Sequence, residues 1–88
     1  MYQIEFKSSV KKDLKNIDKS KIRIILTEIE KLKSGIEDNE HIIKLKGNNP
    51  YYRFRISDYR VVFEKFEEKL IILVVKIGHR KDIYKRLP

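Results

Sequence analysis

Arginine side chains recur on one side of the strands expected in the last third of the chain. Arg53 and Arg55 are two positions apart, so in a β-strand both side chains point to the same face of the sheet. The dipeptide Ser57-Asp58 is typical of a two-residue hairpin turn, and such a turn places Arg55 opposite Arg60. Opposed like charges destabilise a sheet, so a fold keeps these arginines on one face most readily when an anion binds there. The spacing therefore predicts an anion site.

A second group of polar side chains follows the last expected strand. The tripeptide Gly78-His79-Arg80 leads into Asp82-Ile83-Tyr84. If this segment is helical, its arginine and tyrosine lie at i and i+4 and stack on each other. Arginine forks match phosphate oxygens, and a tyrosine or a histidine can orient groups or relay protons. We therefore expect a phosphate site with the catalytic candidates Arg53, Arg55, Arg60, His79, Arg80 and Tyr84.

A phosphate site of this kind suits the cleavage of RNA, because RNA carries its own nucleophile, the 2′-hydroxyl beside the scissile phosphate. The protein has to orient that hydroxyl, remove its proton, stabilise the extra charge on phosphorus and help the 5′-oxygen to leave. Fixed arginines suit the third task, and a preorganised donor of this kind is worth roughly a hundred- to a thousandfold in rate. The reaction requires no metal, and we expect no cofactor. A histidine pair at a recognisable spacing is missing, so the identity of the base stays open.

The charge balance favours a polyanionic or an acidic partner. The chain has 21 Lys and Arg residues against 13 Asp and Glu residues, which gives a net charge of +8. The positive charges cluster, because the segment 42–56 is basic and has no acidic residue. Aromatic rings beside such a surface can stack on unpaired bases. The RNA-binding candidates are Lys44, Lys46, Tyr51, Lys81 and Lys85.

Each candidate also has a structural interpretation that gives it no functional role. Exposed lysines are often only solvated, and tyrosines at alternating strand positions usually belong to the core. The alternatives are Arg60 paired with Glu64 or Asp58, Arg80 paired with Asp82, His79 on a surface loop, Lys44 and Lys46 in solvent, and Tyr52 and Tyr59 in the core.

Other classes of site have little support in the sequence. The two histidines, His41 and His79, are not accompanied by cysteines or carboxylates at the spacing of metal ligands. The glycines are scattered, so there is no Gly-rich phosphate loop, and Ser8 and Ser9 are better helix caps than nucleophiles. The chain also lacks cysteine, a signal peptide and any apolar run long enough to cross a membrane. We therefore expect a protein of the cytoplasm.

The elements that position these residues follow from the apolar periodicity. The segment 2–7 alternates apolar and polar residues, as a half-buried strand does. Helical spacing then predicts a short helix capped by Ser8 or Ser9 and a longer one that is capped by Asp18 or Ser20 and ends at Gly35. The segment 42–45 is expected to be irregular or extended. The remaining expected elements are strands at 51–56, 59–66 and 70–77 and a short terminal helix.

These elements fit one small domain. A chain of 88 residues allows a single domain, 1–88, with one core. The expected fold is α+β in the order β-α-α-β-β-β-α, with a mainly antiparallel four-stranded sheet, two helices packed on one face and a short C-terminal helix. The helices would cover the side of the sheet that carries Phe54, Val61 and Phe63. The opposite side, with the arginines, would stay open.

The order of elements and two motifs resemble the RelE/ParE superfamily of toxins from type II toxin–antitoxin systems, and the RelE branch most of all. The motifs are YYRFRISDYRVVFE at 51–64 and IGHRKDIYKRL at 77–87. The resemblance implies an endoribonuclease that enters the ribosomal A site, cuts mRNA through the substrate's 2′-hydroxyl and leaves a cyclic phosphate. By position, Arg60 and Arg80 would stabilise the charged phosphate, and Tyr84 would orient the substrate.

The chain departs from the RelE pattern at the two positions that bear on which group removes the proton from the 2′-hydroxyl. Arg53 and Arg55 stand where RelE-like proteins place two basic residues, usually lysines, one of which is proposed as the general base. Arginine is effectively never deprotonated. Either Arg55 then acts only through its charge, or another group such as His79 accepts the proton.

The resemblance also implies partners and leaves alternatives open. It implies an acidic, RelB-like antitoxin that blocks or distorts the basic site, and contact with operator DNA only through that antitoxin. No membrane partner is expected. A ParE-like inhibitor of DNA gyrase shares the scaffold, and a catalytically degenerate module that binds RNA or antitoxin also fits the arginines at 53 and 55.

Overall fold

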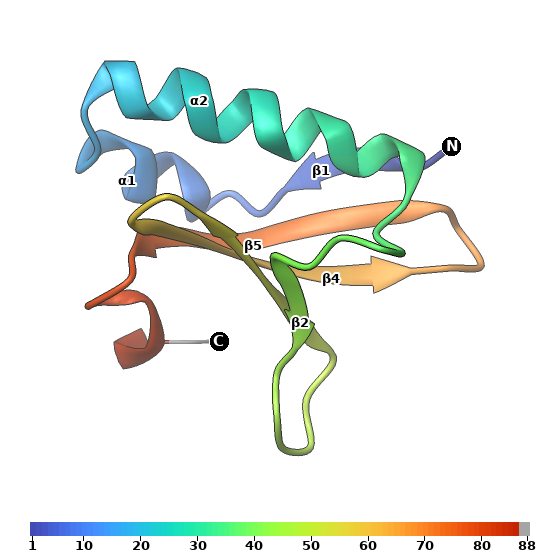
Figure 1. Cartoon of the computed structure of the whole chain (residues 1–88). Coiled ribbons are helices and arrows are strands. Elements are labelled where there is room, and N and C mark those ends of the chain that lie inside the picture. Colours follow the sequence, from blue (N-terminus) through green and yellow to red (C-terminus); the bar gives the residue numbers. More distant parts are fainter. Residues whose placement is uncertain (87–88) are drawn as a thin grey trace.

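The fold is α+β with a five-stranded mixed sheet, so the expectation of a four-stranded sheet is wrong. The computed structural model describes the backbone of residues 1–86 and the side chains of residues 1–84. The strands lie side by side in the order β1-β5-β4-β3-β2 (Figure 1). Their bounds are Gln3–Phe6 for β1, Ile42–Lys44 for β2, Tyr51–Ile56 for β3, Tyr59–Phe66 for β4 and Ile71–His79 for β5.

The additional strand is β2, in the segment that the sequence left irregular or extended. Ile42 pairs with Phe54 of β3, and Lys44 pairs with Tyr52, in antiparallel register. Three residues are too few for an alternating pattern to be recognised, so the segment carries no strand signal of its own. It becomes a strand because the edge of β3 offers unpaired backbone groups.

The pairing of β1 with β5 is parallel, which makes the sheet mixed. The register runs from Gln3 opposite Ile71 to Phe6 opposite Val74. The other three strand pairs are antiparallel. Parallel neighbours need a long crossover connection, and here both helices and the rest of the sheet lie between the two strands in the sequence. The long sequence separation explains why local patterns did not predict this pair.

The meander of β3, β4 and β5 follows the predicted ranges closely. Residues Ser57-Asp58 form the turn between β3 and β4, with Ser57 at a φ of 55°. Arg55 therefore pairs with Arg60, as the turn predicted. The register of β4 against β5 shifts by one residue between Val62 and Phe63, and β5 continues to His79. The extension of β5 carries the chain to the end of the sheet where the arginines lie.

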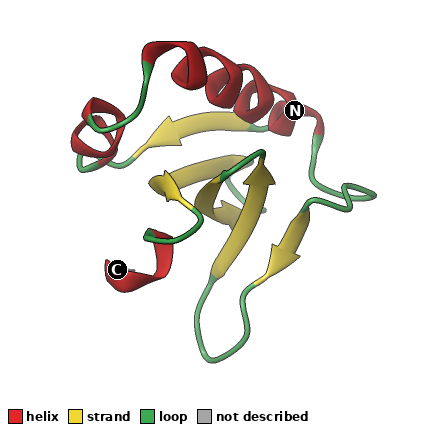
Figure 2. Cartoon of the chain, turned by 60° about the vertical axis from the view of Figure 1, so that its left-hand side comes forward, coloured by secondary structure: helices red, strands yellow, loops and turns green. Residues whose placement is uncertain are grey.

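Both helices lie on one face of the sheet (Figures 1 and 2). The helix α1 spans Val10–Lys15 and α2 spans Lys19–Glu30, and the 3₁₀ helix η1 (Lys31–Ser34) continues α2 for one turn. Gly35 ends this run at a φ of 108°, a conformation that glycine adopts without strain. Ser9 and Asp18 stand at the N-cap positions, but neither side chain makes a capping hydrogen bond.

The main core fills the layer between the helices and the sheet. Burial of apolar side chains is the dominant favourable term in folding, and these residues supply it. The Asp13 carboxylate adds a polar tie, because its Oδ2 accepts a hydrogen bond of 3.0 Å from the Ile77 N–H, beyond the point where β1 ends. The buried core residues are Val10, Ile17, Ile25, Ile29, Leu32, Ile36, Phe54, Ile56, Val61, Phe63, Ile72, Val74 and Ile77.

The expected C-terminal helix is a single 3₁₀ turn, so that expectation is wrong as well. The turn, η2, spans Ile83–Arg86 and lies on the side of the sheet away from α1 and α2 (Figure 1). Ile83 is fully buried there against Val62 and Val75. Four residues with one buried anchor cannot show helical periodicity in the sequence. The second face of the sheet is thus partly covered rather than fully open.

Candidate anion-binding site

The predicted arginines gather on the face of the sheet away from the helices. Arg55 pairs with Arg60, and Arg60 pairs with Gly78, so these positions form one row across β3, β4 and β5. Arg53 lies in the next row, opposite Val62, which faces the same side. Because alternate residues of a strand share a face, the three side chains lie together. We call the surface formed by Arg53, Arg55, Arg60, Arg80 and Tyr84 the arginine face.

Tyr84 is joined to the arginine face by a hydrogen bond across the fold. Nη1 of Arg53 donates to the Tyr84 hydroxyl oxygen at 3.0 Å, between residues 31 apart in the sequence. The neighbouring Ile83 anchors the turn, and Tyr84 itself is 47% exposed. Arg53 is half-buried, and within residues 1–84 its Nε has no hydrogen-bond partner. The phenol is therefore held beside the arginines while its ring stays accessible to a ligand.

Arg60 is the most constrained cation of the group. Its Nη1 donates to the Ser57 carbonyl at 3.0 Å and to the Tyr59 carbonyl at 2.9 Å. Burial lowers the pKa of Arg60 from its ordinary value, and the nearby charge of Arg53 lowers it further. Tyr84 acts in the opposite direction, whereas Arg55 and Arg80 add to the lowering. Within the described residues Arg60 makes no ion pair with Glu64 or Asp58, so its charge is available to an anion.

Arg80 reaches the site from the turn that follows β5. Its backbone N–H donates to the Asp58 carbonyl at 2.8 Å, and its Nε lies 3.9 Å from Asp58 Oδ1. Both groups are more than half exposed, so this ion pair contributes little stability. The helical turn begins only at Ile83, so the expected i, i+4 stacking of Arg80 on Tyr84 within one helix does not form. The hairpin turn, rather than a helix, positions Arg80.

Arg55 contacts a residue that sequence reasoning did not include in the site. Its Nη2 lies 2.9 Å from Nδ1 of His41, and its backbone N–H donates to the His41 carbonyl at 2.9 Å. His41 stands one residue before β2, where the register of Ile42 with Phe54 places it opposite Arg55. The sequence holds no signal for this contact, because it depends on the pairing of a strand that local patterns did not predict.

His79 lies on the other face of the sheet. It pairs with Tyr59 of β4, whose ring packs against the main core, and the two rings meet edge to face at 5.7 Å. Its Nδ1 accepts a hydrogen bond from the Lys81 N–H at 3.2 Å. A hollow of about 480 Å³ beside it is lined by Asp13 of α1, by Asn16 just after that helix and by residues of β5. The structure therefore does not bring His79 together with the arginines.

The predicted RNA-binding residues divide between the two faces. Tyr51 is half-buried with Val62 and Val75 on the same side as the arginines. Lys44 lies on the other side, with Nζ 5.9 Å from the Tyr52 ring centroid, and donates to the Asn49 carbonyl. Lys46 and Lys81 are exposed on loops. The side chain of Lys85 lies outside the described residues.

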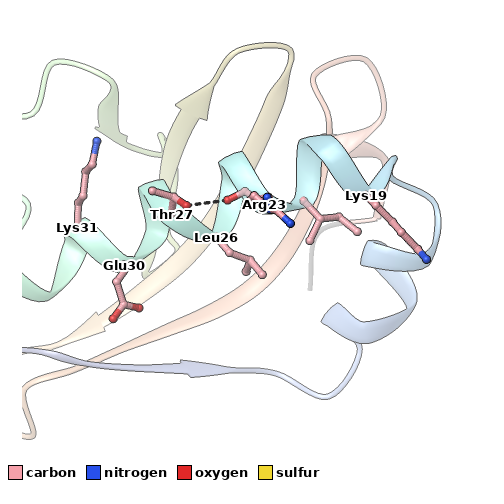
Figure 3. Close-up of a pocket in the computed structure, with 7 residues that line it drawn as sticks. Lys19, Arg23, Leu26, Thr27, Glu30 and Lys31 are labelled. Carbon is pink, nitrogen blue, oxygen red and sulfur yellow. Dashed lines mark hydrogen bonds between the residues drawn. The ribbon is translucent and has the colours of Figure 1, made fainter.

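A second hollow lies along the outer side of α2 (Figure 3). It has a volume of about 740 Å³ and is lined by Lys19, Ile22, Arg23, Leu26, Thr27, Glu30 and Lys31. The Thr27 hydroxyl donates to the Arg23 carbonyl at 2.8 Å, within the helix itself. The side chains in Figure 3 do not converge on one point as a catalytic group would. This surface is remote from the arginine face, because α2 covers the opposite side of the sheet (Figure 1).

Two other kinds of feature are missing from the described part of the chain. No group of three or more His, Cys, Asp or Glu side chains there is arranged to hold a metal ion. None of the helices in residues 1–86 is both long and apolar enough to cross a membrane.

Comparisons with known proteins identify the family of this chain and relatives that share its fold. Residues 4–84 match the family model described as the ParE toxin of type II toxin–antitoxin systems, parDE. A Methanocaldococcus jannaschii protein named as toxin RelE1 is 34% identical over 86 residues, which cover 96% of each chain. Toxin RelE3 of the same organism is 30% identical and covers 98% of this chain and 99% of its own. A crystal structure titled as the archaeal RelE-RelB complex from Pyrococcus horikoshii superposes with a TM-score of 0.76, at 28% identity over 90% of this chain and 94% of that one.

Proposed function

Because the chain belongs to the ParE toxin family of type II toxin–antitoxin systems, within the RelE/ParE superfamily, we propose that it is a ribosome-dependent endoribonuclease. It would cut mRNA in the ribosomal A site through the substrate's own 2′-hydroxyl. The arginine face is the observation that carries this proposal. A cluster of like charges destabilises a sheet unless an anion offsets it. Burial lowers the pKa of Arg60, and the charges of Arg53, Arg55 and Arg80 lower it further, which is consistent with a cluster of cations.

The proposed reaction assigns one task to each group. The 2′-oxygen gives its proton to a solvent water and forms a bond to phosphorus, while the bond from phosphorus to the 5′-oxygen breaks and that oxygen takes up a proton from water. Arg60 and Arg80 stabilise the additional negative charge on the phosphate oxygens: the Arg60 guanidinium is held by two backbone carbonyls before the substrate arrives, and Arg80 reaches the phosphate from the turn after β5. Tyr84 orients the substrate, and its hydroxyl is held by Arg53. Arg53 and Arg55 act through their charge, because arginine does not accept a proton.

The partners follow from the same surface. The structure titled as the RelB-RelE antitoxin-toxin complex from Methanococcus jannaschii has a TM-score of 0.75 and 30% identity to this chain, over 96% of it and 99% of that chain. We infer that this protein likewise binds an acidic, RelB-like antitoxin, which complements its net charge of +8. Operator DNA would be contacted only through the antitoxin. Lys46, Lys81 and Tyr51 would guide the RNA strand toward the arginine face.

Inducible expression in a bacterial host with 5′-end mapping of cellular mRNA tests the proposal. Wild type should arrest growth and produce cuts within translated frames, and Arg60→Ala and Arg80→Ala should each lower cleavage about a hundredfold or more. Arg23→Ala is the matched control, because Arg23 is an exposed arginine of α2 on the opposite side of the sheet. Intact mRNA despite full induction of folded wild-type protein would refute the nuclease.

A second function is favoured by the family model itself, which describes the ParE toxin. A ParE-like protein would inhibit DNA gyrase and leave mRNA intact. The same expression experiment, joined to a gyrase supercoiling assay with purified protein, separates the two functions. Growth arrest with inhibited supercoiling and no mRNA cuts would replace the nuclease by the gyrase inhibitor. No growth arrest from folded protein would instead indicate a module that only binds RNA or antitoxin.

A further inference from the structure

We propose that His41 is an additional phosphate-binding residue of the arginine face, and that it contributes positive charge only when protonated. This inference rests on the proposed function in one respect, that the arginine face binds RNA phosphates. His41 was not among the residues that the sequence pointed to. Its place in the site comes from the pairing of β2 with β3.

The position of His41 is well determined by its backbone. Its N–H donates to Oδ1 of Asn39 at 2.9 Å, and its carbonyl accepts from the Arg55 N–H at 2.9 Å. His41 therefore extends the cross-strand row that contains Arg55, Arg60 and Gly78 by one position, onto the residue that directly precedes the edge strand β2. Adjacent strands lie about 4.8 Å apart, so a protonated imidazole there would form a continuous line of charge with the two arginines.

The contact between the two side chains couples Arg55 to one tautomer of the imidazole. The distance from Arg55 Nη2 to His41 Nδ1 is 2.9 Å, and a guanidinium can only donate. Where Nδ1 accepts this hydrogen bond, the ring is the neutral tautomer that carries its proton on Nε2. In this state His41 positions Arg55 and occupies one of the donors that a phosphate would use.

Protonation of His41 changes both its hydrogen bond with Arg55 and the charge of its ring. Nδ1 then becomes a donor, releases Nη2 of Arg55, and the ring adds a unit of positive charge to the row. The charged groups that face the ring are Arg55, Arg60 beyond it on β4, and the Glu40 carboxylate, which lies 3.8 Å from Nε2. A phosphate bound to Arg55 would supply negative charge beside the ring, where it would stabilise the imidazolium.

The expected consequence is RNA binding that tightens as pH falls. Imidazole is the side chain whose ordinary change of charge falls between about pH 5 and about pH 8. One additional phosphate contact steepens the dependence of log K on log salt concentration by about 0.7 for a single strand. At about 0.1 M salt this corresponds to about fivefold tighter binding of the protonated form.

The test measures fluorescence anisotropy of a labelled 2′-O-methyl RNA oligonucleotide, which cannot be cleaved, so binding is read independently of nuclease activity. Wild type is titrated at several salt concentrations at about pH 8 and about pH 5.5. We expect tighter binding and a steeper salt slope at the lower pH. His41→Gln should lose both changes, and His41→Lys should keep the steep slope at both pH values, because its charge is permanent. His79→Gln is the matched control, because that histidine lies on the other face of the sheet.

Each outcome has a defined meaning. Loss of the pH dependence in His41→Gln together with its retention in His79→Gln would support the proposal. Equal pH dependence in wild type and His41→Gln, or none in wild type, would overturn it while leaving RNA binding by the arginines intact. No binding at either pH would overturn it together with the premise that this face binds RNA phosphates. Circular dichroism and thermal unfolding of every variant establish that the comparison is made between folded proteins.

Discussion

At the scale of residues, the site consists of cations that face one another more than they face acidic partners. Arg60 donates to two backbone carbonyls, and its pKa is lowered by burial and by Arg53, Arg55 and Arg80 against the opposite effect of Tyr84. Arg80 has only a long, exposed contact with Asp58. Such an arrangement costs folding free energy and is available to an anion. Function and stability should therefore respond in opposite directions when a charge is removed.

The substitution Arg55→Gln makes this opposition measurable. Removing the charge opposite Arg60 should raise the free energy of unfolding by about 0.5 kcal/mol at low salt, because like charges no longer oppose across the strands. The same variant should bind RNA less tightly and with a salt slope smaller by about 0.7. Urea unfolding at low and high salt measures the first effect, and oligonucleotide titration measures the second.

The control for that prediction is the variant Arg23→Gln on α2. It should change neither the free energy of unfolding nor the binding of RNA appreciably. A lower free energy of unfolding for Arg55→Gln at low salt would contradict the prediction. It would mean that the contact of Arg55 with His41 stabilises the fold more than the charge repulsion destabilises it.

At the scale of elements, the one-turn helix η2 determines whether Tyr84 reaches the arginines. Its anchor is Ile83, which is fully buried against Val62 and Val75. Gly78 lies against this anchor, because a Cβ at that position would be 3.4 Å from Ile83 Cδ1, in van der Waals contact. Of the two side chains of η2 that the structure describes, Ile83 is the buried one and Tyr84 is exposed.

The substitution Ile83→Ala should separate the attachment of η2 from the rest of the fold. We expect a loss of about 2 kcal/mol or more in the free energy of unfolding, together with loss of the position that holds Tyr84 at Arg53. RNA cleavage should fall as far as it does in Tyr84→Ala. Thermal unfolding and single-turnover cleavage measure the two effects, and full cleavage by Ile83→Ala would show that η2 is not needed for the reaction.

A second connection between elements is the bond from the Ile77 N–H to the Asp13 carboxylate, which holds α1 against β5. Asp13→Ala should lower the free energy of unfolding by about 1 to 3 kcal/mol, because it leaves a partly buried donor without its acceptor. Asp13→Asn retains an acceptor oxygen and should lose less. Urea unfolding of both variants beside Lys12→Ala, an exposed neighbour, measures the difference. Equal losses in the two Asp13 variants would contradict a role as acceptor.

At the scale of the whole molecule, the net charge of +8 on 88 residues opposes compaction. Raising the salt concentration from about 0.02 M to about 0.5 M screens this repulsion and should raise the melting temperature by about 5 °C. A single-stranded oligonucleotide at low salt should give an increase of its own, because it binds only the folded state. Scanning calorimetry measures both, and a melting temperature that falls with salt would show that attractive ion pairs dominate instead.

Prediction from the sequence succeeded where the signal was local. The alternation in 51–56 and 59–66 and the turn at Ser57-Asp58 predicted the hairpin and the pairing of Arg55 with Arg60, which the register confirms. Helical spacing predicted α1 and α2 on one face of the sheet. The grouping of Arg53, Arg55 and Arg60 followed directly from these patterns, because strand periodicity assigns side chains to faces without knowledge of the rest of the fold.

Only the tertiary structure decided the features that depend on contacts between distant segments. Strand β2 forms because β3 offers an edge, β1 joins β5 in parallel, and η2 forms around one buried isoleucine. The alternation of 2–7 predicted β1 itself but not its parallel partner, whereas β2 and η2 are too short to show a periodic pattern. For the same reason His41, rather than His79, lies beside the arginines: it directly precedes β2, which has no signal until it is paired.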